Sequence, residues 1–201
     1  MHETASPLTI RTMRSDELAL AVEWAAQEGW NPGLHDAVPF FAADPGGFLV
    51  GELDGEPVSV ISAVRYGSSY GFIGFYIVKP EFRGKGHGWA IWQAALARLQ
   101  GRTVGLDGVV AQQDNYRRSG FELAHRNARY AGQQSPDVAP HAVSGVQLVA
   151  IGQLPPEALQ AYDRSFFPAA RTDFLQAWVT QPGTVALAAP GDGGLLGYGV
   201  V

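Results

Sequence analysis

The segment that decides the fold is VKPEFRGKGHG, residues 78–88. The residues leading into it, Tyr70–Val78, are rich in the aromatic and β-branched side chains that strands favour. In the residues after it, 89–99, apolar side chains recur at helical spacing. The sequence therefore predicts a strand, a glycine-rich turn and a helix in direct succession.

Glycines at three alternate positions of this turn favour a bound anion. Gly84, Gly86 and Gly88 let the backbone approach a ligand closely with its amide hydrogens pointing outward. The N-terminus of the following helix adds a partial positive charge, and Arg83 and Lys85 add full ones. A pyrophosphate suits such a turn. A flexible turn without any ligand is the alternative that this pattern alone leaves open.

The glycine spacing excludes two common nucleotide-binding motifs. The dinucleotide fingerprint Gly-x-Gly-x-x-Gly, started at Gly84, needs a glycine where Trp89 stands. The Walker loop needs Ser or Thr after its lysine, whereas Lys85 is followed by Gly86. Neither motif therefore describes this turn.

The composition is that of a globular protein. A length of 201 residues is enough for one full α/β domain with chain to spare, or for two small domains. No apolar run reaches the roughly 18 residues that a bilayer span needs, so no membrane partner is expected. The absence of cysteine excludes disulfides and a cysteine nucleophile. The start, Met1-His2-Glu3-Thr4, lacks the pattern of a secretory leader, so we expect a cytoplasmic protein.

The charge is unevenly distributed along the chain. The formal net charge of −5 argues against a nucleic-acid partner. Residues 79–130 nevertheless carry nine Lys and Arg against four Asp and Glu. One basic stretch in an acidic chain indicates a local anionic ligand rather than a polyanionic surface.

The elements around the turn define an α/β (α+β) fold. We expect a meander of antiparallel strands with helices on both faces, and Asp54-Gly55 is a strong hairpin signal within it. The strands are expected at Leu8–Met13, Phe48–Leu53, Pro57–Tyr66, Tyr70–Val78, Thr103–Ala111 and Phe121–Tyr130, and the helices at residues 15–27, Leu34–Ala43, Trp89–Leu99 and Asp114–Ser119. The expected first domain is residues 1–131, followed by a linker at residues 132–143 that is rich in Gln, Ser and Pro.

The pattern begins again in residues 144–201. Gln181-Pro182-Gly183 before Val185–Ala188 mirrors Asp44-Pro45-Gly46 before Phe48–Val50. A strand is expected at Val146–Ile151, a helix at Pro156–Arg164 and a last strand at Leu195–Val201. This stretch therefore predicts a partial second copy of the first fold. An open edge on its last strand leads us to expect either a truncated chain or completion by another copy, as in a homodimer.

Two motifs together resemble the GCN5-related N-acetyltransferase (GNAT) superfamily. The first is Val78-x-Pro80-x-x-Arg83-Gly84-x-Gly86-x-Gly88, which is similar to the family's Gln/Arg-x-x-Gly-x-Gly/Ala turn. The second is Tyr116-Arg-Arg-Ser-Gly120-Phe121, which is similar to its Tyr-x-x-x-Gly-Phe signature. The resemblance covers about two thirds of the chain, and the repeat after the linker resembles tandem GNAT proteins. It implies a mixed, mostly antiparallel central sheet with helices on both faces, followed by a partial second repeat.

The resemblance implies transfer of an acetyl group from acetyl-CoA to a primary amine of an unknown acceptor. The backbone of Arg83, Gly84, Lys85, Gly86, His87 and Gly88 would bind the CoA pyrophosphate, and Ile77 and Val78 would pair with the pantetheine arm. A non-catalytic CoA-binding regulatory module is the alternative. Both readings suit the basic stretch and the extended, amide-bearing pantetheine.

The remaining roles are assigned less directly. Tyr116 would protonate the leaving thiolate if the family role carries over. Trp30 and Asn31 fall where the family's acceptor pocket forms, although core packing is the other reading for Trp30. No base can be named, and Glu23, Glu28 and Glu52 are unranked candidates. No metal is expected, because His87 has no partner at ligand spacing.

Overall fold

A computed structural model describes residues 7–33, 35–128, 130–133 and 145–201. The chain divides into two compact units. One comprises residues 1–106 together with 148–201, and the other comprises residues 107–147. Most of the expected linker, residues 134–143, lies outside the described residues.

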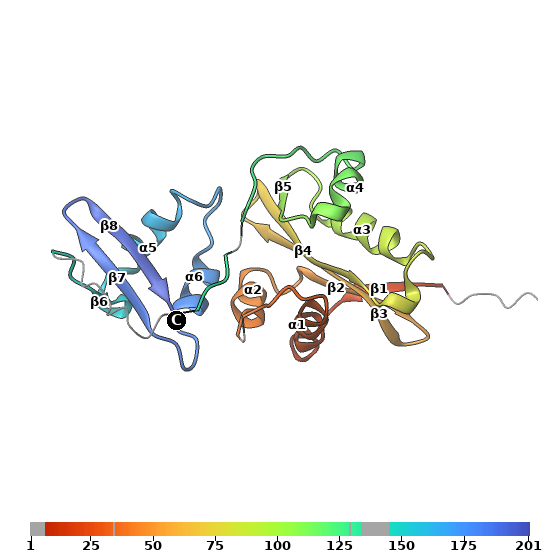
Figure 1. Cartoon of the computed structure of the whole chain (residues 1–201), viewed down its shortest axis with the longest axis horizontal. Helices are drawn as coiled ribbons and strands as arrows, with labels where there is room; N and C mark the ends of the chain where they lie inside the picture. Colours follow the sequence, from red (N-terminus) through yellow and green to blue (C-terminus); the bar gives the residue numbers. More distant parts are fainter. Residues whose placement is uncertain (1–6, 34, 129, 134–144) are drawn as a thin grey trace, which may run out of the picture. The chain divides into compact units, whose positions relative to one another are not determined.

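The first unit contains a five-stranded sheet whose strand order follows the sequence (Figure 1). The first four strands are antiparallel, and the last pair is parallel. The prediction of a mixed, mostly antiparallel sheet is therefore confirmed. The strands are β1 Thr9–Thr12, β2 Phe48–Leu53, β3 Glu56–Tyr66, β4 Tyr70–Val78 and β5 Thr103–Leu106.

The expected hairpin joins β2 to β3. Asp54 and Gly55 both have positive φ, 50° and 80°, as a type I′ turn requires. This turn matches the right-handed twist of the flanking strands, which is why the dipeptide is a reliable signal.

Helices cover both faces of this sheet, as expected (Figure 1). One face packs against α1 and α2, and the other packs against α3. The helix α2 begins three residues later than predicted, because a start at residue 34 would place Pro39 in the helix interior, where its ring clashes with a carbonyl. The bounds are η1 Ser15–Glu17, α1 Leu18–Gln27, α2 Ala37–Ala43, η2 Pro80–Phe82 and α3 His87–Arg98.

A β-bulge interrupts β4 in its middle. Val60 of β3 pairs with Ile77, but Ser62 pairs with Gly74, so β4 carries one more residue than β3 over this interval. Within the interval Phe75 has a φ of 46°, which is unusual for a residue with a side chain. The bulge bends β4, so the two ends of the strand run in different directions.

The C-terminal part of this unit forms a second, three-stranded antiparallel sheet. The predicted strand at Val146–Ile151 shortens to two residues, and α6 was not predicted at all. The elements are β6 Val149–Ala150, η4 Ile151–Gln153, α5 Pro156–Asp163, α6 Thr172–Val179, β7 Ala186–Gly191 and β8 Gly194–Val200. With α6 present, a helix, a Pro-Gly turn and a hairpin follow one another here as they do from α2 to β3.

In the described residues of the second unit there are one 3-10 turn, η3 Val110–Gln112, and one helix, α4 Gln113–Arg118. The predicted strand Phe121–Tyr130 is wrong, because residues 121–128 and 130 are not in a strand. Most of these residues are exposed, and without a neighbouring strand an extended segment has no ladder to join. The strand predicted at Thr103–Ala111 likewise ends at Leu106.

Candidate functional site

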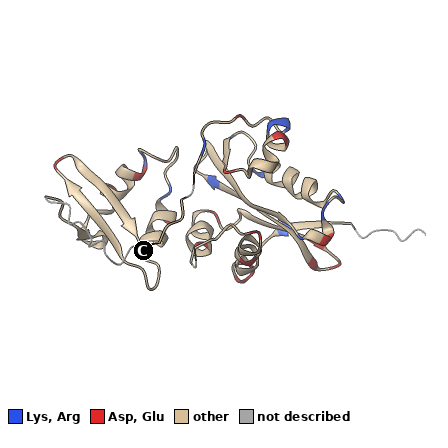
Figure 2. Cartoon of the chain, in the orientation of Figure 1, with Lys and Arg blue, Asp and Glu red and all other residues tan. Residues whose placement is uncertain are grey.

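The glycine-rich turn links the end of β4 to the start of α3. Gly84 and Gly86 have φ values of 75° and 87°, and Gly86 caps α3 in the left-handed conformation. A Cβ atom at either position would meet no atom within 4 Å, so glycine is needed for conformation rather than for space. The turn lies on the surface and carries Lys and Arg (Figure 2).

The amide groups at the start of α3 take no part in the backbone hydrogen bonds of the described residues. The first intrahelical bond runs from Ala90 N–H to the Gly86 carbonyl, at 3.0 Å. Across the described part of the chain, the amides of residues 86–89 make no backbone hydrogen bond. Four such donors at a helix N-terminus form a ready-made anion site.

Gly88 sets the distance between α3 and β4. A Cβ atom there would lie 2.9 Å from the Tyr76 hydroxyl oxygen and 3.1 Å from Val78 Cγ2. The neighbouring His87 packs its ring against Phe82, with ring centroids 6.4 Å apart. The third glycine of the motif therefore serves helix-strand packing.

The two basic residues of the turn differ in what they contact. Arg83 Nε donates to the Val78 carbonyl at 2.8 Å, and its Nη2 pairs with the Glu28 carboxylate at the end of α1. Arg83 therefore ties the end of β4 to α1 and has part of its charge neutralised. Lys85 is exposed, with its Nζ 5.4 Å from the centre of the Phe82 ring.

The edge of β4 near the turn has no strand beside it in the first unit. The parallel strand β5 pairs only with Tyr70–Ile73. Beyond the bulge at Phe75, Ile77 and Val78 pair with β3 on one side alone. Backbone groups on the open side can accept an extended ligand as they would accept another strand, and one of them, the Val78 carbonyl, already accepts a hydrogen bond from Arg83 Nε.

The two expected acceptor residues follow α1 directly. Trp30 is partly buried beside the core cluster on the α1 face, and its amide donates to the Ala25 carbonyl at 3.0 Å. Asn31 is exposed with a φ of 50°.

The three carboxylates that were candidates for the base lie in different places. Glu28 pairs with Arg83 beside the turn. Glu52 pairs with Arg11 on β1, at the other edge of the sheet, and Glu23 is an exposed residue of α1 that accepts from Gln27. Of the three, Glu28 alone contacts a residue of the turn.

Tyr116 belongs to the second unit, where it begins a helix-ending motif. The Phe121 amide donates to the Tyr116 carbonyl at 3.1 Å, and the Gly120 amide donates to the Arg117 carbonyl at 3.0 Å. Gly120 has a φ of 88°, so the Tyr-x-x-x-Gly-Phe spacing is that of a Schellman cap. Burial raises the pKa of Tyr116 above its usual value of 10, so the hydroxyl keeps its proton at neutral pH.

The described residues contain no group of three or more His, Asp or Glu side chains placed to hold a metal ion. None of the helices in the described ranges has the length and apolar character needed to cross a bilayer.

A mixed sheet joined to a helix through this glycine turn is the fold class of the acetyltransferases. Residues 14–121 match the model of the acetyltransferase (GNAT) family, and residues 159–201 match that of an acetyltransferase (GNAT) domain. The chain therefore belongs to the GNAT acetyltransferase family, and GNAT-like sequence recurs after the first match.

Two curated proteins show similarity in sequence. Holothin acyltransferase of Pseudoalteromonas sp. (strain SANK 73390) is 32% identical over 182 residues, which cover 90% of this chain and 60% of the relative. An uncharacterized Caenorhabditis elegans protein, F36G3.2, is 46% identical over 48 residues, covering 23% of this chain and 15% of its own length. The chain thus spans about three fifths of the Holothin acyltransferase sequence.

Solved structures share the fold. A Pyrococcus horikoshii protein named as an acetyltransferase superposes with a TM-score of 0.77 at 20% identity, covering 100% of this chain and 70% of that one. Ard1 from Thermoplasma volcanium has a TM-score of 0.50 at 23% identity, covering 59% of this chain and 84% of that one. At these identities the likeness concerns the fold.

Proposed function

We propose that this chain is an acyl-CoA-dependent N-acyltransferase that moves an acetyl group from acetyl-CoA to a primary amine. The observation that carries the proposal is the set of unbonded amides at residues 86–89, next to the open edge of β4, in a GNAT-family chain. An anion with an extended, amide-bearing arm matches both features at once.

We assign the donor contacts to the backbone. We expected the amides of residues 83–88 to hold the pyrophosphate, but the Arg83 amide donates to the Pro80 carbonyl at 3.2 Å. We therefore assign this role to the amides of residues 84–88, with the exposed Lys85 adding charge. The pantetheine arm lies along the open edge of β4 at Ile77 and Val78. Because Arg83 is engaged with Glu28 and the Val78 carbonyl, we assign its side chain to positioning the turn rather than to binding phosphate.

The chemistry requires proton transfers at both the amine and the sulfur. An alkyl amine with a pKa near 10 must lose a proton to a base or a water chain before its nitrogen attacks the thioester carbonyl carbon. The carbon-nitrogen bond then forms, and the nitrogen gives up a second proton. The carbon-sulfur bond breaks, the leaving sulfur takes a proton from the Tyr116 hydroxyl, and the proton released by the nitrogen restores that hydroxyl. This assignment rests on the resemblance of residues 116–121 to the family's Tyr-x-x-x-Gly-Phe signature.

The acceptor remains a class, a small molecule or a peptide that bears a primary amine, and Trp30 and Asn31 are our candidates for its contacts. The similarity to Holothin acyltransferase makes holothin the first compound to test. A panel of amines, aminoglycosides and peptides, assayed for CoA release, would extend the search.

Binding of acetyl-CoA tests the donor assignment directly. At a ligand concentration 100 times the dissociation constant, acetyl-CoA should stabilise the protein by about 2.7 kcal/mol, measured as a shift in urea midpoint. No shift at millimolar acetyl-CoA would contradict the proposal.

Substitution of Tyr116 by Phe separates an enzyme from a CoA-binding regulatory module. If Tyr116 donates the proton, kcat should fall by about 10²-fold while the dissociation constant for acetyl-CoA stays the same. Tyr130→Phe, an exposed tyrosine of the same unit, is the matched control and should keep full activity. Equal activity of Tyr116→Phe and the wild type would remove Tyr116 from the mechanism.

The proposal extends to the organisation of the chain. We propose a first GNAT domain at residues 1–131, a linker at 132–143 and a second repeat at 144–201, in a cytoplasmic protein that does not bind nucleic acid or membranes and that forms a homodimer. Sedimentation tests the dimer, and cell fractionation tests the location. A monomer at micromolar concentration would contradict the former.

A further inference from the structure

One tryptophan stands apart from the other four. Trp24 and Trp92 are buried, Trp30 and Trp178 are partly buried, and Trp89 is 61% exposed. In the described structure Trp89 has no ring contact and no side-chain hydrogen bond of its own, whereas Trp92, three residues later, packs against Tyr76. The largest apolar side chain on the surface of α3 therefore has no structural partner.

Trp89 is also placed at the candidate donor site. It is the third residue of α3, and its amide is one of the unbonded group at residues 86–89. Helical side chains lean toward the helix N-terminus, so the indole covers surface beside Lys85 and Gly86 rather than farther along α3. The space around Gly84 and Gly86 is open.

The direction of the donor follows from what is buried. With a diphosphate bound at the turn, the pantetheine arm runs back along the open edge of β4 toward Phe75. The nucleoside on the other side of the diphosphate must leave the turn in the opposite direction. It cannot pass on the side of Gly88, Ile91 and Trp92, because that side of α3 packs against the sheet. The exposed side of α3, where Trp89 lies, is open to it.

We propose that Trp89 is a stacking surface for the adenine ring of the donor. The inference rests on the proposed function and adds a specificity residue to it: the nucleotide end of the donor is recognised by an aromatic face, while the turn recognises only its charge. Stacking of a base on an aromatic side chain needs an exposed flat ring next to a phosphate site, which is the arrangement found here.

Two ligands that differ in the nucleotide test the proposal. CoA carries the adenine, and 4′-phosphopantetheine shares the arm but lacks the nucleoside. We expect Trp89→Ala in the full chain to weaken CoA binding about tenfold, a loss typical of one stacked base. Binding of 4′-phosphopantetheine, measured by calorimetry on the same samples, should not change.

Two further variants control this comparison. Gln93→Ala removes an exposed side chain one turn later on α3 and should leave both affinities unchanged. Trp89→Phe keeps an aromatic ring and should retain most of the CoA affinity. It should also lose the quenching of tryptophan fluorescence that CoA, but not 4′-phosphopantetheine, causes in the wild type. This second readout does not depend on the stability of the Ala variant.

The possible results separate the two hypotheses. If the wild type does not bind CoA, the proposed function and this inference both fail. If the wild type binds CoA but Trp89→Ala binds it equally well, or loses both ligands in equal measure, the stacking role is wrong while the donor site stands.

Discussion

The distance between α3 and β4 depends on Gly88, because a residue with a side chain would hold the helix farther from the strand. Gly88 is in the first turn of α3 and faces Tyr76 and Val78, both on β4. Because the amides of the turn are fixed to the start of the same helix, a shift of α3 also moves the candidate anion site. Packing in the core and the geometry of the site are therefore coupled at this residue.

Substitution of Gly88 by Ala should destabilise the protein by about 1–2 kcal/mol, since the new Cβ forces Tyr76 and Val78 to move. Urea unfolding measures the change. Gly152→Ala is the matched control, because a Cβ there meets nothing within 4 Å and the backbone is not left-handed. Equal stability of the two variants would show that α3 tolerates displacement.

The sequence predicted which residues form the turn better than it predicted what each of them contacts. The glycines and the strand-turn-helix order were predictable, since positive φ and backbone approach are properties of residue type. The pairing of Arg83 with Glu28 was not, because 55 residues separate the two and only the packing of α1 brings them together. The sequence assigned the charge of Arg83 to a bound anion, but within the protein that charge is partly neutralised by Glu28.

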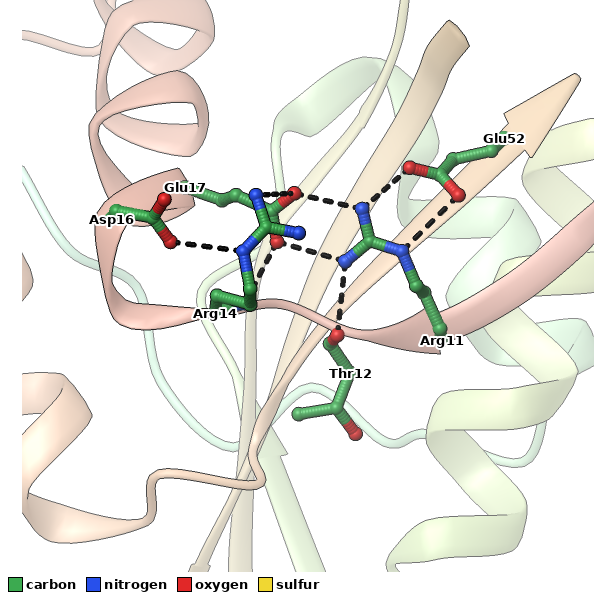
Figure 3. A network of polar contacts seen from close by, with 6 residues as sticks. All are labelled: Arg11, Thr12, Arg14, Asp16, Glu17 and Glu52. Atoms are coloured by element: carbon green, nitrogen blue, oxygen red, sulfur yellow. Dashed lines mark hydrogen bonds and ion pairs between the residues drawn. The ribbon is translucent and has the colours of Figure 1, made fainter. Parts of the chain in front are cut away.

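At the edge of the sheet, a network of charges joins three elements, β1, η1 and β2. Arg11 of β1 lies between Glu17 of η1, at 2.7 Å, and Glu52 of β2 (Figure 3). Glu17 also accepts the Arg14 amide at 2.8 Å. These bonds lower the pKa of Glu17 to about 2, with the Arg11 hydrogen bond as the main cause.

The contribution of this network should depend on pH. The carboxylate of Glu17 has a lower pKa in the folded state than the ordinary value of 4.5, so its stabilisation is present above pH 4.5 and is lost as the pH falls toward 2. Glu17→Gln should cost about 1 kcal/mol at pH 7, allowing for solvent screening, and much less near pH 2. Urea unfolding at the two pH values measures this difference.

Asp16→Asn is the control for this experiment. Asp16 is exposed and pairs only with the exposed Arg14, so its loss should matter little at either pH. A pH-independent effect of Glu17→Gln would indicate a packing role instead of a charge effect.

Elements with a local signal were predictable, and elements that depend on distant neighbours were not. The Asp54-Gly55 hairpin carries its turn conformation in its own residues. The segment 121–130 has strand-like composition, but its described residues form no strand. At the N-cap of α6 stands Arg171 rather than one of the capping residues that would mark the helix start. The apolar face of α6 is explained only by packing, since the ring centroids of Phe174 and of Phe40 on α2 lie 5.0 Å apart.

A buried ion pair in the C-terminal part of the first unit is set among aromatic rings. Arg171 binds Asp163 through two hydrogen bonds, of 2.9 and 2.7 Å, and Asp163 is only 3% exposed. The guanidinium lies 4.3 Å from the centre of the Phe167 ring, which itself packs edge-on against Tyr66 at the end of β3. The ion pair thus lies beside the aromatic contact by which the C-terminal part meets the sheet.

Substitution of Asp163 by Ala should cost about 3–5 kcal/mol, because it leaves the Arg171 charge buried without its partner. Replacing both residues, as in Asp163→Leu with Arg171→Met, should recover most of that loss, since a well-packed apolar pair removes the desolvation cost as well. Urea unfolding of the single and double variants makes the comparison. A double variant no more stable than Asp163→Ala would argue against an unpaired charge as the cause.

The extra residue in β4 has a consequence for how relatives of this chain are aligned. Before Phe75 the even-numbered residues Tyr70 and Phe72 contact the core on the α1 face, whereas after it the odd-numbered Ile77 does so. Deleting one residue near position 75 would therefore send Ile77 toward α3 and Tyr76 away from Trp92, inverting one end of the strand while sparing the other. An alignment that moves a gap across this point exchanges inside for outside, so the phase of β4 has to be counted separately from each end.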